Sequence, residues 1–159
     1  MWNRFAKPAA GRCDVLAISS TGGHWIELLL LRPAFDGLAV AFVCSSPRGR
    51  DDVPGTNFTA VADANLRTPL RALICLLQVA RIVVSLRPSV VVSTGAGPGL
   101  FGAAVAAMLG SRTVWVESLA GVTKISVSGR LARLFVSRFI VQWPDLATDG
   151  RAEYHGSLL

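Results

Sequence analysis

The sequence predicts an α/β fold, a single Rossmann-like doubly wound parallel sheet. Short apolar runs rich in β-branched residues alternate with longer apolar stretches that have helical spacing. The inner runs are continuously apolar, which is typical of strands buried on both faces. No repeat or linker divides the chain, so we expect a basic tail at residues 1–12 and one domain at residues 13–159.

The first half of the chain predicts three strands and two helices. The strands are expected at residues 13–19, 39–44 and 58–61. One helix is expected from His24 to Leu31, ended by Pro33, and a longer one from Leu70 to Leu86, with Pro69 in its first turn. Residues 45–57 are polar and rich in proline and glycine, so they predict a loop.

The second half predicts three more strands. They are expected at residues 89–93, 112–116 and 139–142. A glycine loop, Thr94–Gly99, separates the first of them from a helix of small residues that ends at Leu109. A second loop at residues 117–128 precedes a short helix at residues 129–136. Strands and helices thus alternate along the whole chain, as in a doubly wound fold.

The composition limits the classes of function. Hydrophobic residues make up 52% of the chain and charged residues 16%, which excludes a disordered protein and indicates apolar surface reserved for a membrane or a partner. The net charge of +6 favours anionic partners such as phospholipid headgroups or phosphate-bearing substrates. The cations are scattered and no aromatic platform accompanies them, which argues against nucleic acid. The three cysteines are far apart, so we expect buried thiols and no metal site.

The first glycine loop follows the first strand and contains Thr21, Gly22, Gly23 and His24. Glycines let a backbone approach a ligand closely, and the start of the next helix offers free N–H groups to an anion. A neutral His24 imidazole at this position can accept the proton of an attacking hydroxyl. The alternative is a capping or packing histidine without a chemical role. The loop lacks the G-x-G-x-x-G pattern of dinucleotide sites.

The second glycine loop contains Thr94, Gly95, Gly97 and Gly99. Three glycines between a strand and a helix are compatible with a phosphate cradle. The loop does not end in Gly-Lys-Ser/Thr, so it is not a P-loop. The alternative is close packing of helix on sheet, which we prefer for Gly99 and Gly102.

The third loop begins with Glu117 at the end of a buried strand, where an unused charge is costly. Its carboxylate can bind a sugar hydroxyl, or it can accept hydrogen bonds from amides of the loop. Lys124, later in the same loop, can meet a diphosphate, or it can simply be solvated.

The helix expected at residues 70–86 has more apolar surface than one sheet face requires. Its polar residues form one narrow stripe at 100° per residue: Arg71, Gln78, Arg81 and Ser85. Arg67 and Arg87 flank the helix. This composition predicts a membrane-surface element, with Arg67, Arg71, Arg81 and Arg87 as membrane contacts. The alternative is a helix buried between the sheet and another helix.

Four motifs in this order resemble a known family: Ser-Thr-Gly-Gly-His, Ser-Thr-Gly-Ala-Gly-Pro-Gly, Val-Glu-Ser-Leu-Ala and Val-Gln-Trp-Pro-Asp-Leu. The chain resembles, over residues 13–159, the PssD/CpsF-type polysaccharide-biosynthesis proteins. They are bacterial relatives of the membrane-anchoring subunit of the split UDP-GlcNAc transferase of N-glycan assembly. The resemblance implies the N-terminal half of a GT-B glycosyltransferase, which binds a lipid-linked acceptor.

The resemblance also implies roles for residues. His24 is the candidate base, Glu117 matches the glutamate of the third motif, and Gly22 and Gly23 match the first loop. The glycines of the second loop lie near the acceptor diphosphate. We expect an inverting, metal-independent hexosyl transfer without a resident cofactor, in which a partner subunit with the C-terminal half of the fold binds the UDP-sugar. The apolar residues 156–159 are the expected docking strip for that partner.

The location expected from the resemblance is the cytoplasmic face of the inner membrane, in exopolysaccharide or capsule synthesis. The first residues carry no long apolar stretch, so we expect peripheral attachment. One rival is a non-catalytic subunit that recruits and stabilises its partner at the membrane. The other is a stand-alone nucleotide-binding Rossmann enzyme, which the segment Cys44-Ser45-Ser46 disfavours because an acidic ribose-binding residue is expected there.

Overall fold

The computed structural model describes residues 13–64, 68–148 and 150–158 of the chain. These residues form one seven-stranded sheet in the order β3-β2-β1-β4-β5-β6-β7, and every neighbouring pair is parallel. The strands are β1 (Val15–Ser19), β2 (Val40–Cys44), β3 (Asn57–Ala60), β4 (Val90–Ser93), β5 (Arg112–Val116), β6 (Arg138–Val141) and β7 (Glu153–Tyr154). The strand order reverses between β1 and β4, so the predicted doubly wound sheet is confirmed. The predicted basic tail lies outside the described residues.

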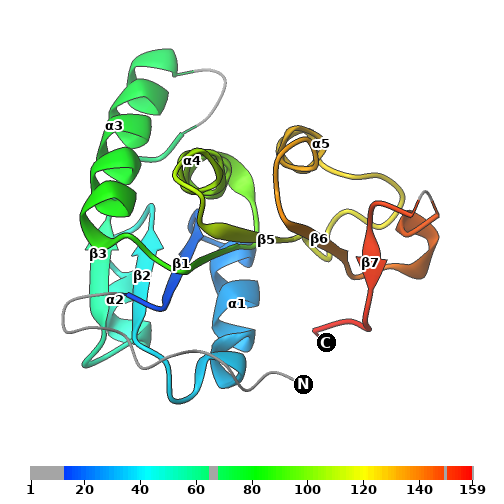
Figure 1. Ribbon diagram of the computed structural model, residues 1–159, viewed down its shortest axis with the longest axis horizontal. Helices are drawn as coiled ribbons and strands as arrows, with labels where there is room; N and C mark the ends of the chain where they lie inside the picture. Colours follow the sequence, from blue (N-terminus) through cyan, green and yellow to red (C-terminus); the bar gives the residue numbers. More distant parts are fainter. Residues whose placement is uncertain (1–12, 65–67, 149, 159) are drawn as a thin grey trace.

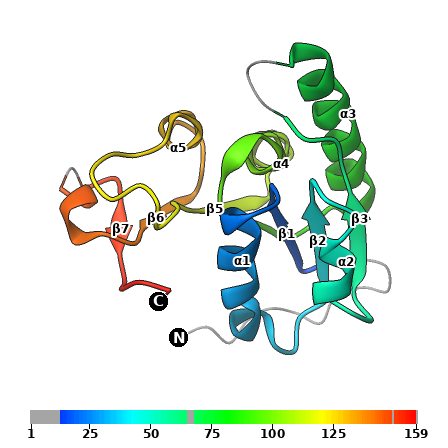
Figure 2. The same cartoon turned by 180° about the vertical axis from the view of Figure 1, so that it is seen from behind.

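Helices cover both faces of the sheet. The α-helices are α1 (Gly23–Leu30), α2 (Gly49–Asp52), α3 (Pro69–Leu86), α4 (Ala96–Met108) and α5 (Val127–Ala132), and the 3-10 helices are η1 (Arg32–Phe35) and η2 (Pro144–Leu146). Figures 1 and 2 show α3, α4 and α5 on one face and α1 and α2 on the other. Helix α4 lies between α3 and α5 and contacts both.

The core explains why the inner strands read as unbroken apolar runs. In β1, Leu16 and Ile18 pack in the cluster that α3 and α4 cover. Val15 and Ala17 point to the opposite face and pack with Trp25 of α1. Each successive side chain of this strand is therefore buried, on alternate faces, and period-2 polarity is absent.

The structure differs from the expected elements at three places. The predicted loop at residues 45–57 contains α2, whose Asp52 accepts a hydrogen bond from Trp25 Nε1 at 2.7 Å. Helix α1 ends at Leu30, before Pro33 as expected, but Pro33 then lies in the unpredicted 3-10 helix η1, because proline is tolerated at the first positions of a helix. The structure adds strand β7 after the strand that was expected to be last. Its two residues are too few to produce a periodic pattern, so the sequence does not predict it.

Two helix starts also differ from the prediction. Helix α4 begins at Ala96, so Gly97 and Gly99 belong to its first turn and not to a loop. Helix α5 begins two residues earlier than expected, where Ser126 Oγ accepts a hydrogen bond from the Gly129 amide at 2.9 Å. A serine in this arrangement is an N-cap, which fixes the beginning of a helix.

Candidate functional site

The three predicted loops meet at the carboxyl ends of β1, β4 and β5. These strands are neighbours in the sheet, with Ile18 opposite Ser93 and Ser93 opposite Trp115. The reversal of strand order between β1 and β4 lies among them, which is where ligands bind in doubly wound folds. The structure therefore brings the first, second and third loops to one edge of the sheet.

His24 and Thr94 join the first two loops by a reciprocal pair of hydrogen bonds. His24 Nδ1 lies 2.8 Å from the Thr94 carbonyl oxygen, and the Thr94 hydroxyl donates to the His24 carbonyl at 2.6 Å. Because a carbonyl oxygen can only accept, Nδ1 must carry the proton. In the neutral ring the lone pair is then on Nε2, which is the nitrogen that can accept a proton from a substrate.

Gly95 makes room for the His24 ring. Its φ of +131° lies in a region that L side chains rarely adopt, and a Cβ there would lie 2.7 Å from His24 Cε1. The next residue, Ala96, has a φ of +62°, in the left-handed region that is unfavourable for a non-glycine residue. Gly95 adopts its φ without strain because it has no side chain, whereas the unfavourable conformation of Ala96 beside a positioned histidine is typical of functional sites.

Helices α1 and α4, which follow the first and second loops, carry no side-chain cap within the described residues. Thr21, Gly22 and Gly23 are exposed at the start of α1, and the Thr21 amide donates to Ser45 Oγ at 2.9 Å. First-turn N–H groups and the positive end of the helix dipole favour anions. The predicted diphosphate contacts of this loop are sterically accessible and stay predictions.

Close packing accounts for several glycines of the second loop. A Cβ on Gly97 would lie 2.6 Å from the Ala64 carbonyl oxygen, and one on Gly99 would lie 2.0 Å from Ser93 Oγ. A Cβ on Gly102 would lie 3.1 Å from Ile18. The packing role preferred for Gly99 and Gly102 is thus confirmed, and a diphosphate contact by Gly97 or Gly99 stays a prediction.

Glu117 is buried beneath the third loop. Its Oε2 accepts from Trp115 Nε1 at 2.8 Å and its Oε1 from the Ser126 amide at 2.7 Å. The second of its two expected roles, as an acceptor for amides of the loop, is confirmed. A contact with a sugar hydroxyl stays a prediction, and it requires this packed loop to open. Lys124, at the other end of the loop, is exposed.

Sequence reasoning missed Glu27, which holds the third loop against α1. Its Oε1 accepts from Ser118 Oγ at 2.8 Å and from the Leu119 amide at 3.1 Å. Only 7% of the residue is exposed, and Oε2 has no partner among the described residues. The signal in the sequence is its spacing: it follows His24 by three positions, so the two side chains share one face of α1.

A second missed residue is Gln142, which connects the third loop to the C-terminal segment. Its Nε2 donates to the Glu117 carbonyl at 3.0 Å, and its Oε1 accepts from the Leu158 amide at 3.0 Å. The neighbouring Trp143 donates from Nε1 to the Leu119 carbonyl at 2.9 Å. These bonds explain the Gln-Trp pair of the fourth motif. Docking of a partner on residues 156–159 stays a prediction.

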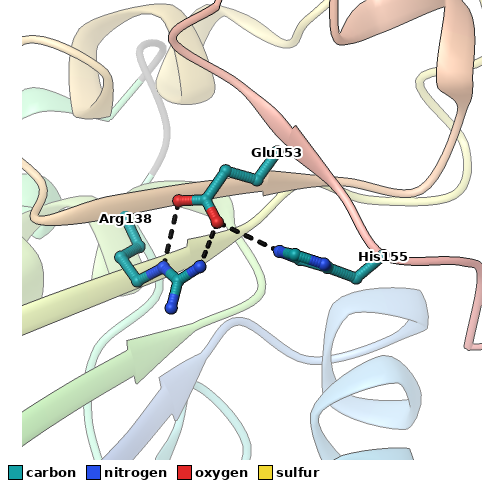
Figure 3. A network of polar contacts seen from close by, with 3 residues as sticks. All are labelled: Arg138, Glu153 and His155. Carbon is teal, nitrogen blue, oxygen red and sulfur yellow. Dashed lines mark hydrogen bonds and ion pairs between the residues drawn. The ribbon is translucent and has the colours of Figure 1, made fainter.

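An ion-pair network lies on the last two strands (Figure 3). Glu153 of β7 accepts from the guanidinium of Arg138 on β6 and contacts His155 Nε2 at 3.0 Å. The hydrogen bonds from Arg138, and then from His155, lower the pKa of Glu153 to about 2. The network fastens the short edge strand to the sheet, away from His24.

Helix α3 is a surface helix with an uncovered apolar face. Only Cys75, Val79 and Val83 are buried, and the stripe of Arg71, Gln78, Arg81 and Ser85 is exposed as predicted. At 100° per residue, five exposed apolar side chains lie in an arc of about 100° on the exposed side. They are Leu70, Leu73, Ile74, Leu77 and Val84. The alternative of a helix enclosed between the sheet and another helix is therefore wrong.

Membrane contact by α3 stays a prediction. Among the described residues, α3 is also the one helix that is long and apolar enough to span a bilayer, and only 17% of it is buried within the domain. Arg87 is exposed at its end, with a φ of +44°, and Arg67 lies outside the described residues.

No site for a metal or a reactive thiol stands out in the part of the chain that the structure describes. It contains no group of three His, Cys, Asp or Glu side chains that could hold a metal ion. All three cysteines are buried and free, and burial raises their pKa values, that of Cys75 to about 11. Such thiols are inert packing groups.

Solved structures share this fold at low sequence identity. The Acinetobacter baumannii MurG crystal structure superposes with a TM-score of 0.71 and 15% identity, over 89% of this chain and 45% of that one. The UDP-GlcNAc 2-epimerase of Methanocaldococcus jannaschii gives a TM-score of 0.67 and 16% identity, over 91% and 45%. The chain thus spans about half the length of these proteins and matches the N-terminal type of domain in GT-B glycosyltransferases and epimerases.

Sequence comparisons are more specific. The chain is 33% identical to the UDP-N-acetylglucosamine transferase subunit ALG14 of Eremothecium gossypii, over 91% of this chain and 80% of that protein. It is 56% identical to the subunit of the same name in Schizosaccharomyces pombe, over 28% of this chain and 22% of that protein. Residues 57–158 match the family model described as "Oligosaccharide biosynthesis protein Alg14 like". The chain therefore belongs to the Alg14-like family of oligosaccharide biosynthesis proteins.

Proposed function

We propose that this protein is the acceptor-binding, membrane-associating subunit of a two-component UDP-sugar glycosyltransferase. Its acceptor is a lipid-diphosphate-linked saccharide in exopolysaccharide or capsule synthesis, as in PssD/CpsF-type systems, at the cytoplasmic face of the membrane. Family membership supports the subunit role, since the relatives are named as subunits of a UDP-N-acetylglucosamine transferase. A second polypeptide binds the UDP-sugar and completes the GT-B enzyme.

The observation that carries the proposal is the orientation of His24. Its Nδ1 proton is committed to the Thr94 carbonyl, so Nε2 is the acceptor of the ring. Nε2 takes the proton of the acceptor hydroxyl, and the hydroxyl oxygen attacks the anomeric carbon from the side opposite the UDP. The bond from the anomeric carbon to the UDP oxygen breaks, UDP leaves with the partner, and the anomeric configuration inverts.

The remaining predicted contacts bind either the acceptor diphosphate or the membrane surface. Gly22 and Gly23 in the exposed first loop, together with Gly97 at the start of α4, hold the acceptor diphosphate through backbone N–H groups. Thr21 contributes its hydroxyl, since its amide donates to Ser45 Oγ, and Gly95 contributes the shape of the loop, since its amide donates to Ser93 Oγ. Lys124 adds a positive charge from the third loop. Arg71, Arg81 and Arg87 meet anionic headgroups, and the apolar arc of α3 enters the interface.

The test compares two substitutions of His24 in the purified subunit pair. In His24→Asn, the side-chain amide can still donate to the Thr94 carbonyl, but no basic nitrogen replaces Nε2. We expect kcat to fall by roughly 10²–10⁴ in both His24→Asn and His24→Ala, with an intact complex. The only other histidine, His155, is exposed on the edge of the sheet, so His155→Ala should keep full activity. Normal turnover in His24→Asn would refute the base role.

A recruiting role without catalysis is the second candidate, and the uncovered apolar face of α3 favours it. In that case the partner alone transfers sugar to a soluble acceptor at the normal rate. If the partner alone is inactive and activity returns on addition of this chain in detergent, without a membrane, recruitment does not explain the requirement.

A further inference from the structure

An apolar groove lies over α4, between the beginning of α3 and α5. Its volume is about 530 Å³, within the range of pockets for small organic ligands. All its lining side chains are apolar or glycine, with Ser128 as the one exception. They include Ala72 of α3, Phe101 of α4 and Leu131 of α5. A ligand in this groove would be buried from water and would find almost no hydrogen-bond partners.

The groove begins at the candidate site. Ala96 and Gly97 line it, and they directly follow Gly95, which packs against the His24 ring. A ligand beside His24 and Gly95 would therefore reach the groove along Ala96 and Gly97. The helix start at this end is the one proposed to hold the acceptor diphosphate.

The rim of the groove is also apolar and uncovered. Leu70 at the start of α3 is 76% exposed, and Val127 and Leu131 on α5 are 55% and 48% exposed. Large apolar side chains that surround a groove in this way mark an interaction site. On the α3 side the rim is continuous with the apolar arc proposed to face the membrane. The groove thus links the site to the surface where a lipid chain would leave the bilayer.

We infer that this groove binds the hydrocarbon chain of the lipid acceptor, at the segment nearest the diphosphate. The inference rests on the proposed function and adds a chain-binding subsite to it. Each methylene group that is moved from water into such a groove increases affinity about fourfold. The subsite therefore makes the enzyme prefer acceptors with a long chain, independently of the membrane.

The experiment measures binding of three soluble probes to the full chain by calorimetry, without membranes or detergent. The probes are farnesyl diphosphate, geranyl diphosphate and inorganic diphosphate, so the chain length varies and the diphosphate stays. We expect affinity to rise at least tenfold at each step of chain length. Equal affinity for all three probes would overturn the inference.

Matched variants locate the effect. Val127→Glu puts a charge into the groove and should weaken farnesyl diphosphate binding at least tenfold. Val84→Glu is the control: Val84 is 51% exposed on α3 but lies outside the groove, 12 residues and about 18 Å along the helix from Ala72. Ala72→Phe fills the groove without a charge and should weaken the same probe. Equal effects of Val127→Glu and Val84→Glu would contradict the assignment.

Two further outcomes separate the possible occupants. Displacement of farnesyl diphosphate by phosphatidylcholine vesicles would assign the groove to membrane lipid and overturn the inference. Sugar transfer by the subunit pair with no dependence on chain length would leave the proposed function intact and reject only the groove. Unfolding midpoints equal to that of the wild-type chain would show that a variant has lost binding and not its fold.

Discussion

The role of Gly95 gives the sharpest test of the site geometry. In Gly95→Ala the new Cβ would lie 2.7 Å from Cε1 and 2.8 Å from Nδ1 of His24. Non-bonded carbon atoms pack at about 3.5–4.0 Å, so the ring must retreat by roughly 1 Å. That movement breaks the 2.8 Å hydrogen bond from Nδ1 to the Thr94 carbonyl.

The expected loss of stability has two parts. An alanine at a φ of +131° costs about 1–3 kcal/mol in backbone strain. The lost hydrogen bond adds about 0.5–1.5 kcal/mol. The sum, roughly 2–4 kcal/mol, lowers the melting temperature by roughly 5–15 °C in a chain of this size. Gly22→Ala is the control, because Gly22 has a φ of +81° but no atom near its Cβ position, so only the strain applies.

A double-mutant cycle isolates the clash with the ring. Gly95→Ala is made in the wild-type chain and in His24→Ala, and unfolding free energies are measured with urea. Without the imidazole only the backbone strain remains, so we expect a coupling energy of at least about 1 kcal/mol. Gly22→Ala should show no coupling to His24→Ala. If the Gly95 and His24 substitutions are additive within about 0.5 kcal/mol, the ring does not lie where we describe it.

Two further predictions concern the third loop and the edge strand. Glu27→Ala leaves the Leu119 amide without its acceptor and should destabilise the fold by about 1–3 kcal/mol in urea unfolding. Glu27→Gln keeps an acceptor and should lose less stability. Equal losses in the two variants would contradict the role of Glu27 in holding the third loop against α1. The carboxyl of Glu153 has a pKa of about 2 in the folded protein instead of 4.5. Because the ionised form is favoured by folding, its contribution to stability is full above about pH 4.5 and is lost as pH falls towards 2. Arg138→Ala should flatten the pH dependence of the melting temperature in this window, and an unchanged profile would contradict the ion pair.

The sequence was sufficient for the fold and for the position of the three loops. Continuous apolar runs identify a parallel sheet, and its strand ends then fix where ligands bind. The sequence could not show that Glu117 is enclosed, because a glutamate after a strand can point to either face. It also could not show that Gly97 and Gly99 begin a helix, since glycine and proline are normal signs of a loop.

The sequence could not predict the contacts of Glu27 or the backbone strain at Ala96, for a different reason. Glu27 meets its partners 91 and 92 positions further along the chain, and no local pattern reports a contact over such a separation. The strain at Ala96 is equally invisible, because alanine is usually a residue of regular helix. Both features follow from tertiary packing, which overrides local preference.

The two hydrogen bonds of Gln142 restrict which side chains can take its place. The group facing the Leu158 amide must accept a hydrogen bond, and the group facing the Glu117 carbonyl must donate one. Glutamate would set two acceptors against each other, lysine would supply donors alone, and asparagine is one methylene shorter. Because one planar amide makes both bonds, a displacement of the C-terminal segment would also disturb the backbone of the third loop at Glu117.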